Sequence, residues 1–204
     1  GPLLLQAGRL RQRMIVSTGM STLSEIEQAL AVIAYGLTCE RKPTSRDDFE
    51  AAYWSVSGRA ALVAHVTLLH CVTDYPAAAS SVNLRAMDTL TAAFELPVGY
   101  SDHTLGNEVS IAAVARGACV IEKHFTLDRT LPGPDHVASL EPTELKQLIG
   151  AIRNVERSLG SSIKQPTENE IANRAVARRS VVAACNIAQG TQLTEEMLTY
   201  KRPG

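Results

Sequence analysis

The sequence lacks the features that are typical of membrane proteins, secreted proteins and nucleic-acid-binding proteins. No apolar run approaches the ~18 consecutive residues that indicate a membrane-spanning helix, and no basic-then-apolar segment resembles a secretory leader. The formal net charge is only −1 at pH 7, so the charge balance gives no reason to expect a nucleic acid or an anionic membrane surface. We therefore expect neither nucleic acid nor membrane among the partners of this protein.

Cysteine is scarce, and its spacing fits neither a zinc site nor a disulfide framework. The chain has four cysteines, Cys39, Cys71, Cys119 and Cys185, without a CxxC pair. Two of the four lie within apolar segments that read as strands. Buried, reduced thiols in a cytoplasmic protein are therefore expected, in preference to a set of disulfides.

What the sequence does contain is a repeated alternation of strand and helix patterns. Short apolar segments at 14–16, 65–71, 97–100 and 118–125 predict strands, and each is followed by apolar residues at helical spacing. This alternation indicates an α/β fold with a parallel sheet and right-handed crossovers. The chain has 204 residues, whereas a complete (β/α)8 barrel usually needs ~250. Four such units do not close a barrel.

Two stretches interrupt this alternation. Residues 38–60 are more polar and predict an extended loop with a short helix around 49–54. After the last long helix, a polar linker at 161–172 leads to a second, small module at 173–204.

Two histidines follow neighbouring strand patterns at the point where each pattern stops. Ser101 and His103 share one face of the third strand, and Glu122 and His124 share one face of the fourth, because side chains alternate along a strand. If the two strands are neighbours, the two imidazoles lie side by side at the carboxyl ends of the sheet, where parallel barrels build their active sites. A divalent metal held by both rings is one interpretation. Two hydrogen-bonded histidines near the rim are the other.

Polar residues after the first two strands have both a functional and a structural interpretation. Ser17, Thr18 and Gly19 enter a helix, where backbone N–H groups can bind a phosphate or carboxylate, but Ser-Thr-Gly is also a common way to begin a helix. Thr73 and Tyr75 share one strand face. They suit hydrogen bonding to a substrate, or simple packing at an edge.

The composition around four further residues favours structural roles. His70 lies inside an apolar run, as a hydrogen-bonded core histidine does. Asp128 and Asp135 flank a Pro-Gly-Pro loop, and Arg202 stands in a Lys-Arg-Pro-Gly sequence that reads as an exposed turn.

Seven segments of the chain together carry a family resemblance: STGMSTLSEIEQAL, LLHCVTDYP, NLRAMDTL, LPVGYSDHTLG, VIEKHFTLDRTLPGPDH, ARRSVVA and KRPG. They resemble the sialic acid synthase family, of the N-acetylneuraminate synthase type, and GYSDHT and EKHFTLDRTLPGPDH are the most specific part. The resemblance covers nearly the whole chain except about 37–62. It implies the last four βα units of a TIM barrel at 1–160 and, after the linker, the N-terminal part of an antifreeze-like (SAF) domain at 173–204.

The resemblance also implies an activity and its requirements. Enzymes of this family condense phosphoenolpyruvate with an N-acetylated amino sugar such as N-acetylmannosamine, release phosphate, and act as homodimers that need a divalent metal, Mn²⁺ or alternatively Mg²⁺. Seven residues acquire roles by this resemblance: His103 and His124 as metal ligands, Ser101 and Thr73 at the phosphate, Tyr75 and Asp135 at the sugar, and Arg202 reaching from the antifreeze-like domain into the partner subunit's site.

Several alternatives remain open. The family's catalytic Glu and phosphate-binding Lys residues belong to earlier βα units that this sequence does not match, so no catalytic residue is assigned. We therefore expect the chain alone to be a fragment with weak or absent synthase activity. Other interpretations are a legionaminate-type synthase, a noncatalytic binding or assembly remnant, and an unrelated metal-dependent barrel lyase that shares the two histidines.

Overall fold

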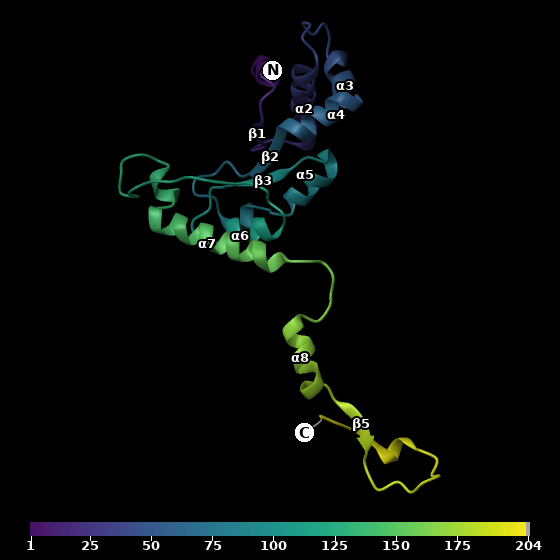
Figure 1. Cartoon of the computed structure of the whole chain (residues 1–204). Helices are drawn as coiled ribbons and strands as arrows, with labels where there is room; N and C mark the ends of the chain where they lie inside the picture. Colours follow the sequence, from purple (N-terminus) through teal and green to yellow (C-terminus); the bar gives the residue numbers. More distant parts are fainter. Residues whose placement is uncertain (203–204) are drawn as a thin grey trace. The chain divides into compact units, whose positions relative to one another are not determined.

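The computed structural model describes residues 1–202 of the chain. Its contacts separate a first compact unit, Gly1–Gly160, from a second unit that begins at Ser161 (Figure 1). Within the described residues, no helix has both the length and the apolar character that crossing a membrane requires.

The first unit alternates helices with short strands, as the sequence pattern predicts. In chain order its elements are α1 (Pro2–Arg9), β1 (Met14–Ser17), α2 (Leu23–Thr38), α3 (Asp47–Trp54), α4 (Val56–His65), β2 (Val66–Cys71), η1 (Ala79–Ser81), α5 (Ala86–Phe94), β3 (Val98–Asp102), α6 (Glu108–Ala115), β4 (Ile121–Lys123), η2 (His136–Ala138) and α7 (Pro142–Leu159). The second unit contains α8 (Glu168–Ala177), β5 (Ser180–Ala183), η3 (Glu195–Met197) and β6 (Leu198–Lys201).

The first unit is built on one parallel sheet with the strand order β1-β2-β3-β4, which confirms the α/β prediction. Helices α5 and α6 pack against β3, and α7 packs on α6 (Figure 1). The β3–β4 ladder ends with Asp102 opposite Lys123. Because side chains alternate along β3, Tyr100 and Asp102 point toward the helices while Ser101 points to the opposite face. That opposite face carries the candidate site.

Helix α2 forms the centre of the buried core. Thr22 and Glu25 close its first turn as a reciprocal capping box, in which the Thr22 N–H donates to Glu25 Oε2 at 2.7 Å. The helix then buries an apolar face that includes Leu30 and Ile33 against the sheet and its neighbours. The core thus combines residues of the sheet with residues of its helices.

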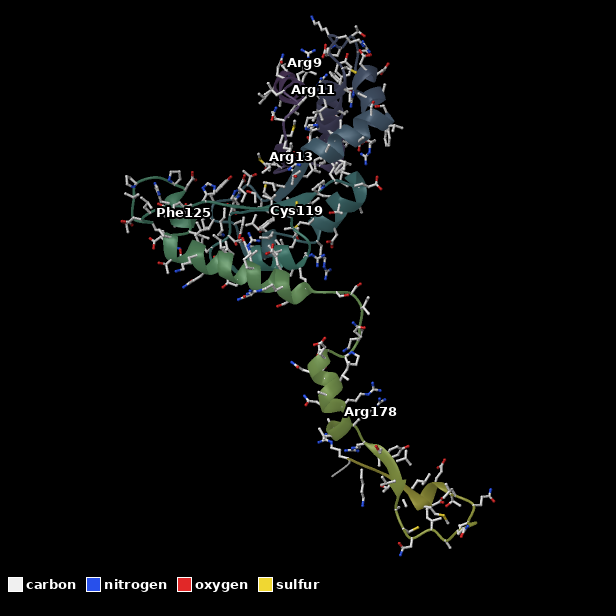
Figure 2. All side chains as sticks on the ribbon, viewed as in Figure 1. Arg9, Arg11, Arg13, Cys119, Phe125 and Arg178 are labelled. Carbon is white, nitrogen blue, oxygen red and sulfur yellow. The ribbon has the colours of Figure 1, made fainter. Side chains whose placement is uncertain are left out.

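Two local predictions for the first unit were wrong. Residues 56–60, expected in an extended loop, belong to helix α4, whose first turn is capped because the Ser55 hydroxyl oxygen accepts from the N–H of Gly58 at 2.9 Å. Strand β4 is shorter than the predicted 118–125. As a result Cys119, which precedes it, and Phe125, which follows it, are both exposed (Figure 2).

The cysteines are all unpaired, and only one of them is buried. Cys71 lies inside β2, whereas Cys119 and Cys185 are exposed and Cys39 is half-buried. The expectation of buried thiols therefore holds for Cys71 alone.

The second unit pairs β5 with β6 as an antiparallel ribbon. Part of the segment predicted as a linker is helical, since α8 begins at Glu168, and Thr167 and Glu170 cap each other as a capping box. The assignment of this unit to an antifreeze-like domain stays a prediction.

Gly99 is required by the close approach of β3 to its neighbours. A Cβ at this position would lie 2.6 Å from Leu69 Cδ2 and 2.6 Å from the Val120 carbonyl oxygen. We expect Gly99→Ala to lower the free energy of unfolding by about 1–3 kcal/mol, as overpacking of a core does, when measured by urea denaturation.

A matched substitution in the same unit should change the free energy of unfolding in the opposite direction. Gly150 lies within α7, and a Cβ there would meet nothing within 4 Å. Gly150→Ala should therefore raise the free energy of unfolding by about 0.5–1 kcal/mol, because alanine loses less backbone entropy in a helix than glycine. Equal effects of the two substitutions would contradict the packing argument.

Candidate functional site

The structure brings His103 and His124 together at the carboxyl ends of β3 and β4. Each histidine is the first residue past its strand, directly after the terminal pair Asp102–Lys123. The two ring centroids are 5.4 Å apart, with an interplanar angle of 68°. The geometric premise of the metal hypothesis, two converging imidazoles, is therefore met.

Hydrogen bonding leaves one nitrogen of His103 available as a ligand. Its Nδ1 lies 2.6 Å from the carbonyl oxygen of Val72. Because a carbonyl oxygen only accepts, Nδ1 carries the proton, and Nε2 of the neutral ring keeps its lone pair. A backbone partner on one nitrogen is the usual support for a metal-binding histidine. Ser101 Oγ is the nearest recorded neighbour of Nε2, at 3.5 Å.

The chain itself offers only part of a coordination shell. Among residues 1–202, no group of three or more His, Cys, Asp or Glu side chains is placed to hold one ion. The two histidines fit the chemistry of a divalent transition metal, for which imidazole is a favoured ligand. Any further ligands would have to come from water, from a substrate or from outside this chain.

Tyr75 completes an aromatic cluster with the two histidines. Its ring lies over His103, with centroids 4.2 Å apart, and meets His124 edge-on at 5.7 Å. We call these three residues the histidine–tyrosine cluster. Tyr75 remains 44% exposed, so the cluster forms one wall of an open site rather than a closed core.

Ser101 and Glu122 make a hydrogen bond on the same face of the sheet. The buried Ser101 hydroxyl donates to Oε1 of the exposed Glu122 at 2.6 Å. Alternation along the strands predicts that these two side chains share a face with the histidines. It does not predict their direct contact, which depends on the register of β3 against β4.

Thr73 lies beside the turn that leads from β1 into α2. A Cβ on Gly19 would lie 2.6 Å from Thr73 Oγ1, so this hydroxyl sits close to the turn backbone. In the same turn, the Thr18 hydroxyl donates to the Leu69 carbonyl at 2.8 Å, and Ser17 Oγ is 2.9 Å from Cys71 Sγ. The Thr18 hydroxyl therefore has a structural partner.

Asp135 is exposed in a loop between β4 and α7 whose two ends are held together. The loop begins and ends at an isolated parallel bridge between Phe125 and Leu140, and the Leu140 N–H donates to the His124 carbonyl at 2.9 Å. The Ser139 hydroxyl donates to the Asp135 carbonyl at 2.7 Å. The loop thus begins at a site histidine and returns to it.

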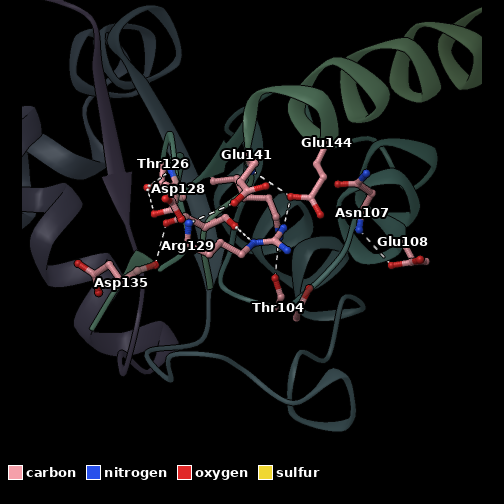
Figure 3. Close-up of polar contacts among 11 residues, drawn as sticks. Thr104, Asn107, Glu108, Thr126, Asp128, Arg129, Asp135, Glu141 and Glu144 are labelled. Carbon is pink, nitrogen blue, oxygen red and sulfur yellow. Dashed lines mark hydrogen bonds and ion pairs between the residues drawn. The ribbon is translucent and has the colours of Figure 1, made fainter. Parts of the chain in front are cut away.

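Arg129 ties the same loop to the start of α7 (Figure 3). Its side-chain Nε donates to the Ser139 carbonyl at 2.9 Å, and its backbone N–H donates to Glu141 Oε1 at 3.1 Å. Its guanidinium also forms an ion pair with Glu144. The hydrogen bond from Arg129 lowers the pKa of the Glu144 carboxyl below its ordinary value.

Three candidates lie outside the cluster. His70 Nε2 is 2.6 Å from the Val82 carbonyl, which confirms a structural histidine. Asp128 Oδ1 accepts from the N–H and the hydroxyl of Thr130, each at 2.7 Å, as a turn residue does. Arg202 is exposed after β6 in the second unit.

A buried ion pair lies behind the site, and strand periodicity did not predict it. Lys123 Nζ lies 2.9 Å from Asp102 Oδ2, and their side chains are 3% and 0% exposed. Burial raises the pKa of the Asp102 carboxyl, but hydrogen bonds from Ser110, Lys123 and Thr104 outweigh burial and bring the pKa below its usual value. The available signal was a lysine inside an apolar strand pattern.

Known proteins are similar to this chain in both sequence and fold. The NeuB family profile matches residues 1–164. The N,N'-diacetyllegionaminic acid synthase of Campylobacter jejuni is 46% identical over 202 residues, which is 99% of this chain and 54% of that protein. The enzyme of the same name from Legionella pneumophila is 44% identical over 203 residues, 100% of this chain and 51% of that protein.

A solved structure is also similar to this chain in fold. The N-acetylneuraminic acid (sialic acid) synthetase of Leptospira borgpetersenii superposes with a TM-score of 0.66 at 34% identity, covering 86% of this chain and 54% of that one. The four-stranded sheet thus corresponds to a curled half-barrel, as the resemblance to a partial (β/α)8 barrel predicts. The chain spans about half the length of the curated relatives described above.

Proposed function

Since the chain belongs to the NeuB family, we propose that it forms part of a synthase that condenses phosphoenolpyruvate with an N-acetylated amino sugar and releases phosphate. The observation that carries this proposal is the histidine–tyrosine cluster at the carboxyl ends of parallel strands. In barrels of this type, that end of the sheet is where catalytic groups gather.

We propose that His103 and His124 hold a divalent metal, Mn²⁺ or Mg²⁺. The proton on His103 Nδ1, held by the Val72 carbonyl, leaves Nε2 free to coordinate. When bound, such an ion supplies Lewis-acid polarisation of a carbonyl oxygen, here the aldehyde of the sugar. The chain's own contribution is to hold the two rings at a fixed separation.

The remaining site residues take their proposed roles from the family resemblance. Thr73 and Ser101 would donate their hydroxyls to the phosphate of phosphoenolpyruvate, Ser101 after turning away from Glu122, while Tyr75 and Asp135 are exposed groups suited to the sugar. In the reaction, the enol carbon bonds to the aldehyde carbon and water adds its oxygen at the phosphate-bearing carbon. The bond from that carbon to the phosphate oxygen then breaks, and phosphate leaves. Fixed donors around the departing phosphate stabilise its charge.

The acceptor is best sought among sugars with two acetamido groups. The relatives at 46% and 44% identity are both named N,N'-diacetyllegionaminic acid synthases, whereas the structural relative named for N-acetylneuraminic acid is 34% identical. We therefore place the legionaminate-type acceptor ahead of N-acetylmannosamine.

We further propose that the second unit is the beginning of an antifreeze-like (SAF) domain and that the intact enzyme is a cytoplasmic homodimer. The β5–β6 ribbon is the only pairing of strands recorded in the described part of this unit. In such a dimer, Arg202 would serve the active site of the partner subunit. These assignments rest on the family resemblance.

The proposal can be tested by joining this chain to the part of a relative that it does not match. In a chimera, this chain replaces the matching half of the Campylobacter jejuni relative. Phosphate release from phosphoenolpyruvate is then measured with Mn²⁺ and either N-acetylmannosamine or the diacetamido precursor of N,N'-diacetyllegionaminic acid. We expect turnover by the chimera, faster with the diacetamido sugar, and little or none by the 204-residue chain alone.

The parent enzyme from Campylobacter jejuni serves as the positive control. A folded chimera that releases no phosphate with either sugar would contradict the proposal and favour a noncatalytic binding remnant. Robust turnover by the chain alone would instead show that four βα units suffice.

A further inference from the structure

We propose that the buried Asp102–Lys123 ion pair is a positioning device that fixes the separation of His103 and His124. The inference rests on the proposed function, because it concerns the two residues that would hold the metal. Each partner is the residue directly before one of the histidines, and the two partners face each other as the last pair of the β3–β4 ladder.

Tyr75 contacts both rings but is itself 44% exposed, and the hydrogen bonds of the two histidines lead away from each other. His103 is hydrogen-bonded to the segment that follows β2, through the Val72 carbonyl at 2.6 Å and the Ala77 N–H at 2.9 Å. His124 is bonded toward its own loop, where its carbonyl accepts from the Leu140 N–H at 2.9 Å. Backbone pairing of β3 with β4 stops one residue before both rings, so neither the ladder nor these bonds set the distance between them.

Lys123 connects the ends of β3 and β4 at the point where their backbone pairing stops. Its Nζ donates to Asp102 Oδ2 at 2.9 Å and to the Thr104 carbonyl at 2.7 Å. The two acceptors flank His103 in the sequence, so the lysine is bonded to the residue on each side of that histidine, to the side chain of Asp102 and to the backbone of Thr104. The Ser101–Glu122 hydrogen bond also joins the two strands, but it lies one register step earlier and its acid is exposed.

Asp102 is in turn held rigidly from its own side. Its Oδ1 accepts from the Thr104 N–H at 2.8 Å and hydroxyl at 2.7 Å, and its Oδ2 accepts from Ser110 Oγ of α6 at 2.5 Å. Burying an ion pair is rarely the most stabilising choice, since apolar residues of similar volume often do as well or better. A fully bonded pair does, however, define one geometry, and ligating groups must be held to within about 0.5 Å.

The decisive variant is Lys123→Met, which keeps the volume of the side chain and removes both Nζ bonds. Two measurements on the purified chain test it: the affinity for Mn²⁺ by calorimetry, and the histidine ring resonances in ¹H–¹⁵N spectra without metal. We expect the affinity to fall about 10–100-fold, the usual cost of losing a group that supports a metal ligand. The ring resonances of His103 and His124 should shift or broaden, because the two rings are no longer held at one separation.

Two controls separate positioning from stability. Leu62→Ala removes buried apolar volume from α4, which precedes β2 at the opposite end of the strands, so it should lower stability and leave both readouts unchanged. Lys146→Met makes the same chemical change on the exposed surface of α7 and should change nothing. If Lys123→Met does not fold, the neutral double variant Asp102→Asn, Lys123→Met takes its place with the same expected result.

The outcomes are distinguishable. Parental affinity and unchanged ring resonances in the Lys123 variant would overturn the inference, as would equal losses of affinity in Leu62→Ala. If the parent chain binds no Mn²⁺, the proposed metal site fails. The metal-free spectra then still decide whether the ion pair positions the rings.

Discussion

Replacing His103 and His124 together with alanine is expected to abolish the binding of Mn²⁺ by this chain. Both nitrogens that the chain can offer to the ion at the carboxyl ends of β3 and β4 are then lost. Loss of a group that merely supports a ligand costs about 10–100-fold in affinity, so loss of each ligand itself should cost more. Calorimetric titration should therefore show no saturable heat in the double variant. In the chimera with the Campylobacter jejuni relative, the same change should eliminate phosphate release.

The matched control is His65→Ala. His65 ends α4 immediately before β2, at the opposite end of the strands from the candidate site. The substitution His65→Ala should leave the affinity for Mn²⁺ unchanged. Parental binding by the double histidine variant would place the ion elsewhere and remove the main support for the proposed chemistry.

The position of the site could be predicted from strand periodicity and from the assumption that β3 and β4 are neighbours. The alternation of Ser101 with His103, and of Glu122 with His124, places each pair on one strand face. Nothing in the sequence states that β3 and β4 are neighbours, but consecutive strands of a parallel α/β fold usually are. The observed order β1-β2-β3-β4 supplied that missing step.

The contacts that stiffen the site could not be predicted in this way, because they join side chains of different elements that meet only when those elements pack together. Ser110 reaches Asp102 only once α6 packs against β3. Arg129 meets Glu144 only when the loop after β4 folds back onto the start of α7. Helix α4 was missed for a local reason, since its only buried residues are Gly58 and Leu62 and its apolar signal is correspondingly weak.

The second large effect is expected on stability, from Asp102→Ala. This change leaves the Lys123 ammonium buried without its carboxylate, because the lysine side chain is only 3% exposed. Removing one partner of a buried pair usually costs about 3–5 kcal/mol, a large share of the ~5–15 kcal/mol that stabilises a typical domain. Urea denaturation at neutral pH should therefore show a marked fall in the midpoint.

Asp88→Ala provides the comparison, because it breaks another aspartate pair, with Arg116 just after α6, at the surface. The side chains of Arg116 and Asp88 are 37% and 55% exposed, and exposed pairs contribute about 0–1 kcal/mol. Similar losses in the two variants would mean that Lys123 is hydrated after all. The double variant Asp102→Asn, Lys123→Met should recover most of the lost stability, since no unpaired charge is then buried and the side-chain oxygen of the introduced asparagine still accepts from Thr104. If the ion pair positions His103 and His124 rather than stabilising the fold, that stable double variant should still bind Mn²⁺ poorly.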